Sequence, residues 1–135
     1  MRIMHRQIAV CTPPKSKEAF VDITAAVQAE IGAMDIEEAF CVISVPHTTA
    51  GITINEYADP DVRRDILTAL THIVPDTLPF RHFEGNSTAH VKTSLMGSSV
   101  TLLIENKKLK LGTWQGIFLC EFDGPRTRKV DIYVR

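Results

Sequence analysis

The sequence lacks the features that mark a zinc ribbon, a redox motif or a membrane anchor. Its three cysteines, Cys11, Cys41 and Cys120, are far apart and form no CxxC pair, which excludes the first two classes. No stretch approaches the roughly 20 apolar residues of a membrane span, and residues 1–10 contain no long apolar segment of a signal peptide. We therefore expect a cytoplasmic protein without membrane contact, in which the cysteines pack as small hydrophobic side chains.

The sequence also lacks internal repeats, low-complexity tracts and an excess of charge of either sign. Its 15 basic and 16 acidic residues give a net charge of −1, so a general polyanion-binding surface is not indicated and we expect no nucleic-acid partner. A length of 135 residues with 44% hydrophobic content is typical of one globular domain. We expect a single domain over residues 1–135.

The first part of the chain combines two predicted strands with a helix. Residues 3–10 alternate loosely and end before Pro13-Pro14, which indicates a strand followed by a rigid turn. Ser16 is a candidate cap for a helix that continues to about Ile31, with Gly32 at its end. Residues 40–45 are apolar almost throughout, which predicts a strand covered on both faces.

The clearest local signal is the helix that begins after Asp59. Asp59 can accept hydrogen bonds from free amides of the first turn, Pro60 suits the first helical position, and Asp61 favours the positive end of the helix dipole. The apolar face consists of Val62, Ile66, Leu70 and Ile73. A short strand over residues 52–54 precedes the helix. A long loop over residues 75–89 follows, and loops of this length are usually functional or disordered.

The remaining sequence is predicted to be β. Four segments are separated by short polar turns, at residues 91–95, 98–104, 109–122 and 128–134. In the last segment Val130, Ile132 and Val134 share one face of the strand. Helices in the first part and hairpin-connected strands in the second predict an α+β domain, an antiparallel sheet or sandwich with two main helices on one face.

Candidate functional residues gather in the segment Pro46–Asp61, which follows a predicted buried strand. Such a segment is either a polar loop with a helix cap or a binding site on a rigid base. Three of the five histidines, His47, His82 and His90, lie beside polar clusters. With nearby carboxylates they would suit a divalent cation such as zinc, magnesium or manganese. A histidine is also a general acid or base near neutral pH, whereas exposed or capping histidines are the commoner case.

Cations and one aromatic side chain add to this candidate site. Arginine and lysine bind phosphate groups, and Arg126 follows a tight turn at residues 123–126. We expect Arg63 to lie on the solvent-exposed face of its helix. Trp114, the only tryptophan, either stacks on a flat ligand or fills a core or an interface.

Several motifs of this chain resemble the YjbQ family, whose members are credited with a secondary thiamine-phosphate synthase activity. The resemblance runs from about Val10 to the C-terminus and rests on segments that occur in the family's order. These segments are His47–Glu56, Asp59–Asp65, Glu84–Asn86, His90–Lys92 and Gly112–Ile117.

The resemblance implies an α+β fold, a homotrimer, and a polar pocket near the subunit boundary that binds a small phosphorylated metabolite. It implies thiamine-phosphate synthesis, in which a pyrimidine-methyl pyrophosphate joins a thiazole phosphate, without an organic cofactor. The predicted catalytic residues are His47, Asn55, Glu56 and His90. The predicted substrate-binding residues are Thr48, Thr49, Lys92, Trp114, Gln115 and Arg126. The predicted metal ligands are His47, His82, His90 and Asp59.

Two alternatives to this enzyme stay open. They are a non-catalytic trimer that binds a metal or a small anionic metabolite, and a metal-dependent hydrolase.

One segment departs from the family pattern. It is Asn106-Lys107, in a predicted hairpin turn where Asn-Gly is expected because the turn requires positive φ angles.

Overall fold

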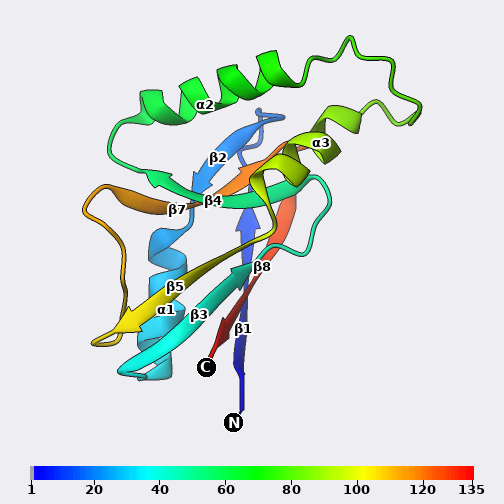
Figure 1. The fold of residues 1–135 in the computed structure, drawn as a ribbon. Coiled ribbons are helices and arrows are strands. Elements are labelled where there is room, and N and C mark those ends of the chain that lie inside the picture. The colour runs from blue at the N-terminus through cyan, green and yellow to red at the C-terminus, as the bar shows by residue number, and fades with distance from the viewer. Residues whose placement is uncertain (1) are drawn as a thin grey trace.

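The computed structural model describes residues 2–135 and arranges them as two antiparallel sheets and three helices (Figure 1). The larger sheet contains, in spatial order, β1 (Met4–Cys11), β8 (Thr127–Val134), β3 (Glu38–Ser44), β5 (Ser99–Glu105) and β6 (Lys108–Leu109). The smaller sheet contains β2 (Ala19–Asp22), β7 (Gln115–Glu121) and β4 (Ala50–Glu56). The helices are α1 (Thr24–Met34), α2 (Pro60–Ile73) and α3 (Ser87–Met96). The predicted single α+β domain is therefore confirmed.

The main core fills the space between the two sheets and is closed by α1. The larger sheet contributes alternate residues of its strands, and α1 contributes one face. The buried side chains from these elements include Val10, Val27, Ile31, Cys41, Ile43, Ile104, Val130, Ile132 and Val134. The facing side chains of the smaller sheet are Ala50, Ile52, Ile117 and Leu119. The predicted common face of Val130, Ile132 and Val134 is thus the inner face of the larger sheet.

A second core lies on the other face of the smaller sheet, under α2 and α3 (Figure 1). Its buried side chains are Phe20, Leu70, Ala89, Phe118, Cys120 and Phe122. Strand β7 lies in the middle of its sheet and supplies both cores, so residues 116–121 are buried without interruption. Relative to the larger sheet, the smaller sheet and its helices lie on one side. None of the helices within residues 2–135 is both long and apolar enough to cross a membrane.

The predicted helix from Ser16 to Ile31 is wrong in its first half. Residues 19–22 form β2, in which Phe20 pairs with Cys120 of β7. The side chain of Asp22 then accepts hydrogen bonds from the Thr24 amide, at 2.9 Å, and from the Thr24 hydroxyl, at 2.6 Å. These contacts precede α1, which begins at Thr24, seven residues later than a helix capped by Ser16 would, and which ends at Met34 rather than at about Ile31.

The predicted strand over residues 91–95 is also wrong, because this segment belongs to α3. The buried face of α3 consists of Thr88, Ala89, Lys92 and Thr93, with helical spacing but little apolar contrast. That composition hides the helix from an analysis of hydrophobic periodicity. The predicted strand over residues 109–122 is interrupted as well, since residues 110–114 connect β6 to β7.

Other sequence predictions match the structure closely. Helix α2 spans residues 60–73, and the Asp59 carboxylate accepts the Asp61 amide at 2.9 Å. Asn106 and Lys107 form a two-residue turn between β5 and β6, with φ angles of 52° and 66°. The lysine adopts this left-handed conformation while its ammonium group contacts Asp35 at 2.6 Å.

The cysteines differ in environment. Cys41 and Cys120 are buried as predicted, and burial raises the pKa of the Cys41 thiol to about 11 and also raises that of Cys120. Cys11 is exposed at the end of β1, contrary to the prediction.

Candidate functional site

The segment between β3 and β4 borders two neighbouring polar cavities. The larger, with a volume of about 600 Å³, is the His47 cavity, and its lining residues are Ser44–Thr49, Ser98, Arg126 and Arg128. The smaller, of about 390 Å³, is the His90 cavity, and its lining residues are His47, Thr48, His90, Thr93, Ser94, Gly97 and Ser98. Because His47, Thr48 and Ser98 line both cavities, a ligand in either one can contact the His47 imidazole.

The His47 ring is held in one neutral form. Its Nε2 accepts a hydrogen bond from the Lys129 amide at 2.9 Å. An acceptor Nε2 carries no proton, so the proton of the neutral ring is on Nδ1. Partial burial and the nearby positive charge of Arg128 lower the pKa of His47 below its ordinary value of 6.5. At neutral pH His47 is therefore an uncharged imidazole whose Nδ1–H is a hydrogen-bond donor.

A buried ion pair supports the wall of the His47 cavity. The Arg128 guanidinium donates from Nε to Glu121 Oε1 at 2.8 Å and from Nη2 to Glu121 Oε2, and both side chains are almost completely buried. Burial disfavours the charged carboxylate, but the hydrogen bonds from Arg128 and from the Asp123 amide outweigh this effect and lower the pKa of Glu121. Arg128 Nη2 also donates to Thr49 Oγ1 at 2.9 Å. The pair therefore connects β7 and β8 to the loop that carries His47.

Arg126 is the more accessible cation of the His47 cavity. About half of its side chain is exposed, and its Nη2 lies 3.0 Å from Asp123 Oδ2. Its backbone amide donates to Thr12 Oγ1 at 2.8 Å, which fixes the main chain beside β1. A phosphate group in the cavity would have to share Arg126 with Asp123, because one guanidinium has donors for more than one acceptor.

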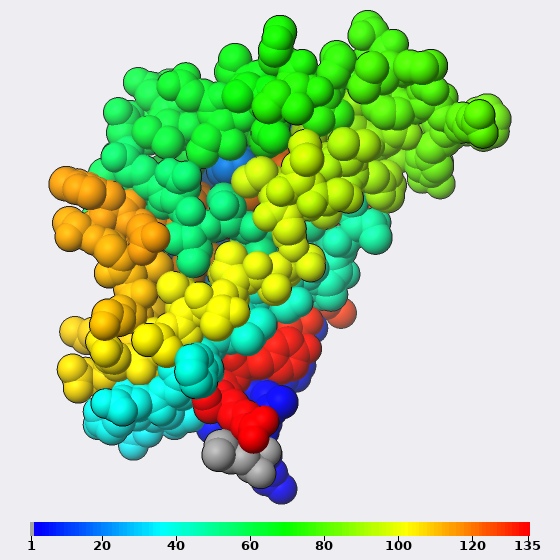
Figure 2. Space-filling view, viewed as in Figure 1, coloured from blue at the N-terminus to red at the C-terminus, as the bar shows by residue number. Residues whose placement is uncertain are grey.

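His82 and His90 lie next to each other, on the far side of the His90 cavity. Their rings meet edge to face, with centroids 5.5 Å apart. Both rings line a third cavity of about 360 Å³, together with Phe80, Arg81, Ser87 and Val91. The loop that carries His82 projects from the molecule (Figure 2). Thus His90 connects the His82 loop to the cavity that it shares with His47.

Two predicted substrate-binding residues have structural contacts instead. Lys92 is only 4% exposed, and its Nζ lies 2.7 Å from Glu18 Oε2. The lysine borders none of the three cavities described above. Thr49 lines the His47 cavity, but its hydroxyl is occupied by Arg128.

The remaining predicted site residues lie at the other end of the smaller sheet. Asn55 and Glu56 end β4, which begins just after the His47 loop, and a strand of this length spans about 20 Å. Trp114 and Gln115 are at that same far end, where Gln115 pairs with Glu56 and the Trp114 carbonyl accepts the Tyr57 amide at 3.0 Å. Asp59 lies at that end as well and caps α2. Within one chain, the predicted site residues are therefore divided between the two ends of the smaller sheet (Figure 1).

The far end has its own unsatisfied polar atoms. Glu56 Oε2 and Arg63 Nε are buried without a hydrogen-bond partner. The Arg63 guanidinium carbon lies 5.0 Å from the centre of the Phe118 ring, and its Nη2 donates to the Tyr57 carbonyl at 3.1 Å. Arg63 is half-buried, so the expectation that it lies on the solvent-exposed face of its helix is wrong. Trp114 is 61% exposed in this chain, so it does not fill the core of the domain.

The predicted metal ligands do not form one coordination sphere in the described chain. Within residues 2–135, no group of three or more His, Cys, Asp or Glu side chains is placed to hold a metal ion. His47, His82 and His90 surround adjoining cavities, whereas Asp59 lies at the far end of β4.

Sequence reasoning missed several residues of the cavities. Ser44 and Ser98 border the His47 cavity, and Thr93 and Ser94 border the His90 cavity. The sequence predicts a strand over residues 91–95, and a strand does not place Thr93 and Ser94 one helical turn after His90, as α3 does. The only local signal for this arrangement is the helical spacing of the small polar face of α3.

These features define a class of small α+β proteins with two stacked antiparallel sheets and polar cavities at one end of the smaller sheet. The sequence matches the family described as UPF0047 protein YjbQ-like over residues 6–135, and the chain belongs to this family. The resemblance noted from the sequence motifs is therefore confirmed.

Relatives and solved structures agree with this assignment. A UPF0047 protein from Methanocaldococcus jannaschii is 52% identical over 119 residues, which cover 88% of this chain and 85% of that protein. A YjbQ/UPF0047 protein structure from Clostridium acetobutylicum has a TM-score of 0.92 at 50% identity, covering 96% of this chain and 99% of that one. A structure from Sulfolobus solfataricus, described as YbjQ-like and of unknown function, has a TM-score of 0.91 at 30% identity, with 98% and 96% covered. The comparisons thus assign the family and the fold, and they assign no activity.

Proposed function

We propose that this protein binds a small phosphorylated metabolite in the His47 cavity. The observation that carries the proposal is the neutral His47 ring, which lines a polar cavity together with Arg126 and Arg128 and whose Nδ1–H is left to donate because Nε2 accepts the Lys129 amide. Phosphate oxygens accept hydrogen bonds, and arginine presents a planar set of donors that suits them. Hydroxyl groups of Thr48, Ser44 and Ser98 add neutral donors around the same space.

The activity that we propose for this site is thiamine-phosphate synthesis. The bond between the pyrimidine's methylene carbon and the pyrophosphate oxygen breaks, and the same carbon forms a bond to the thiazole nitrogen. Pyrophosphate leaves with the electron pair of the broken bond, so negative charge accumulates on its oxygens. Arg126 and the Nδ1–H of His47 would stabilise this charge, and His47 would carry a proton if the leaving group accepts one.

The proposal includes a homotrimer, because one chain keeps the two polar ends of the smaller sheet apart. Trp114 is exposed at the far end, about 20 Å along β4 from the His47 loop. An exposed tryptophan would stack on the flat pyrimidine if a neighbouring copy brought its far end to the His47 cavity. Asn55, Glu56 and Gln115 would reach the substrate in the same way.

A divalent cation is a further part of the proposal, with zinc, magnesium or manganese as candidates. His82 and His90 supply two neighbouring nitrogen donors, fewer than the three or four protein ligands of zinc sites. Oxygens of the substrate pyrophosphate, or His47 through the shared cavity, would complete the set. A bound cation would supply positive charge to the leaving group.

Turnover of the two precursors by the purified protein tests the activity. We expect thiamine phosphate to form with the wild type, and with a His72→Gln control that changes an exposed histidine of α2. We expect no product with His47→Gln. Binding of the precursors without turnover would favour the non-catalytic alternative. Release of inorganic phosphate that depends on an added metal would favour the hydrolase. Absence of both binding and turnover would overturn the proposal.

A further inference from the structure

The third cavity, next to the His90 cavity, has a cation of its own. This Arg81 cavity lies between the loop that follows α2 and the start of α3, and its volume is about 360 Å³. Its lining residues are Phe80, Arg81, His82, Ser87, His90 and Val91. Ligand pockets usually measure about 300–1,000 Å³, so a cavity of this size suits a small metabolite.

The guanidinium of Arg81 is available to an anion. Within residues 2–135 no salt bridge includes Arg81. The Ser87 hydroxyl and the imidazoles of His82 and His90 are further possible donors around the same space. One carboxylate is near, since Glu84 Oε1 lies 3.7 Å from His82 Nε2, but Glu84 does not line the cavity. This set of donors suits a phosphate group.

The Arg81 cavity also has an apolar part, and its walls are anchored. Phe80 and Val91 are each 38% exposed, and a phenylalanine ring offers a flat face for stacking. The Phe80 amide donates to the Leu78 carbonyl at 2.8 Å, which tightens the loop beside Arg81. At the other end of the loop, Asn86 Nδ2 donates to Asp123 Oδ2 at 3.0 Å and fixes the start of α3. Donors for an anion and a surface for a flat ring therefore occur together.

The three adjoining cavities differ in charge. His47 lines the first and the second cavity, and His90 lines the second and the third. Arginines line the first and the third, whereas the lining of the His90 cavity contains no Asp, Glu, Lys or Arg. In this neutral middle Thr93 is 7% exposed, and its Oγ1 is buried without a hydrogen-bond partner. A buried hydroxyl without a partner is unfavourable, so a polar group of a ligand beside Thr93 would be stabilising.

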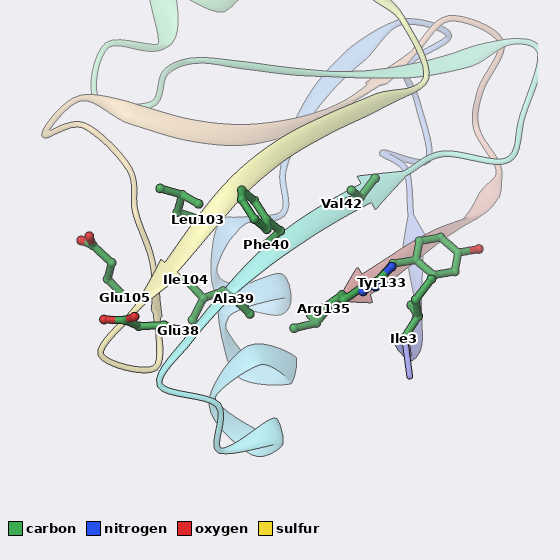
Figure 3. Close-up of a pocket in the computed structure, with 11 residues that line it drawn as sticks. Ile3, Glu38, Ala39, Phe40, Val42, Leu103, Ile104, Glu105, Tyr133 and Arg135 are labelled. Atoms are coloured by element: carbon green, nitrogen blue, oxygen red, sulfur yellow. The ribbon is translucent and has the colours of Figure 1, made fainter. Parts of the chain in front are cut away.

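A larger hollow, on the outer face of the larger sheet, lacks this combination. Its volume is about 820 Å³, and its lining is mainly apolar (Figure 3). Glu38 and Glu105 both line it, and Arg135 is the single basic residue of the lining. Two carboxylates repel a phosphate group, so charge rather than size favours the Arg81 cavity as an anion site.

We propose that the Arg81 cavity binds a phosphate monoester carried by a small flat ring, with the ring directed toward the His90 cavity. In the proposed synthesis this ligand is the thiazole phosphate, so the inference rests on that function and places its second substrate. The pyrophosphate of the first substrate occupies the His47 cavity, and the two anions are thereby kept apart.

This arrangement puts the reacting atoms in the neutral His90 cavity. The thiazole nitrogen donates its electron pair to the methylene carbon there, and the pair of the broken carbon–oxygen bond leaves with pyrophosphate. Thr93 Oγ1 lies beside this region as a hydrogen-bonding group for the substrates. A divalent cation between His82 and His90 would add positive charge on the side of Arg81, so the two proposals are compatible.

Calorimetric titration with the thiazole phosphate, in a buffer that contains a metal chelator, tests the Arg81 cavity. Arg81→Met removes the guanidinium, and Arg64→Met makes the same change at an exposed arginine of α2 that lines none of these cavities. We expect Arg81→Met to weaken binding of the thiazole phosphate by roughly tenfold to a hundredfold, and Arg64→Met to leave it unchanged. The affinity for pyrophosphate should be the same in both variants, because that anion binds at His47. Both arginines are exposed, so both variants should fold, which circular dichroism checks.

The outcomes separate the cavity from the reaction. If the wild type and Arg81→Met bind the thiazole phosphate equally, or if the wild type does not bind it at millimolar concentration, the Arg81 cavity is not its site. If binding depends on Arg81 but no thiamine phosphate forms, the cavity is correctly assigned and the proposed synthesis is wrong. If Arg81→Met weakens pyrophosphate binding as strongly as thiazole phosphate binding, the assignment of one anion to each end is wrong.

Thr93→Val tests the neutral middle. The change keeps the shape of the side chain and removes a hydroxyl that has no partner, so the Tm should not fall. The affinity for thiamine phosphate, the product that would pass Thr93, should fall by roughly twofold to tenfold, as expected for one neutral hydrogen bond. The affinity for pyrophosphate alone should stay the same. Unchanged affinity for thiamine phosphate would show that the ligand does not pass Thr93, and would overturn this arrangement of the two substrates.

Discussion

Removal of the Arg128 guanidinium should destabilise the fold strongly, although Arg128 lies at the edge of an open cavity. Arg128→Met keeps the length of the side chain but leaves the fully buried Glu121 carboxylate without its partner and Thr49 Oγ1 without a donor. Breaking a buried ion pair in this way costs about 3–5 kcal/mol of the free energy of unfolding. The Tm should fall by roughly 10 °C or more, and the protein should remain folded at 25 °C because domains have about 5–15 kcal/mol of stability.

The pH dependence of this loss gives a sharper test. In the wild type the pKa of Glu121 is lowered, so its stabilisation is complete above the ordinary value of 4.5 and disappears as the pH falls through the lower folded value. In Arg128→Met the unpaired buried carboxylate should have a raised pKa, so acid neutralises it and relieves the penalty. The difference between wild type and variant should therefore shrink between pH 7 and pH 5.

Urea unfolding at several pH values measures this difference. Lys129→Met is the matched control, because its side chain is exposed and only its backbone amide contacts His47. Glu121→Gln combined with Arg128→Met should recover part of the loss, since no unpaired charge remains buried. A loss for Arg128→Met below about 1 kcal/mol, or equal to that of Lys129→Met, would refute the reasoning.

Two further predictions concern a helix cap and two glycines. Asp59→Ala removes the acceptor of the Asp61 amide, so the free energy of unfolding should fall by about 1 kcal/mol. Precursor affinity should then change only if a neighbouring copy brings Asp59 to a site. Gly51→Ala should destabilise, because the new Cβ would lie 2.7 Å from the Gly97 carbonyl oxygen, between the His47 loop and α3. Gly32→Ala in α1 meets nothing within 4 Å and should stabilise by about 0.5–1 kcal/mol. Thermal melts of each variant check these directions.

The parts of the fold that the sequence predicts are those with a complete local signal. Asp59-Pro60-Asp61 contains a cap, a suitable first residue and a dipole partner, so α2 follows from its own sequence. Helix α3 could not be predicted in this way, because its buried face consists of Thr88, Ala89, Lys92 and Thr93. The buried amine of Lys92 is acceptable only beside Glu18, a partner 74 residues away.

The candidate site was harder to predict than the fold because pairing between strands decides which residues meet. The segment Pro46–Asp61 is continuous in sequence, but β4 extends through its middle and places His47 and Asp59 at opposite ends. In contrast, the loop and helix after α2 bring His90 to a cavity that it shares with His47. Neither arrangement has a local signal, since both depend on the register of β4 with β7 and on the position of α3.

The most direct test of the phosphate site is the pKa of the His47 imidazole, measured by NMR titration with and without pyrophosphate. In the free protein the pKa should lie below 6.5, because burial and Arg128 disfavour the charged ring. Bound pyrophosphate would place negative charge beside the ring, so the pKa should rise on binding. The ring resonances of the exposed His72, which lines neither cavity, serve as the control and should not move when pyrophosphate is added. If pyrophosphate leaves the His47 pKa unchanged at concentrations that saturate the protein, the anion does not bind beside His47 and the central proposal is contradicted.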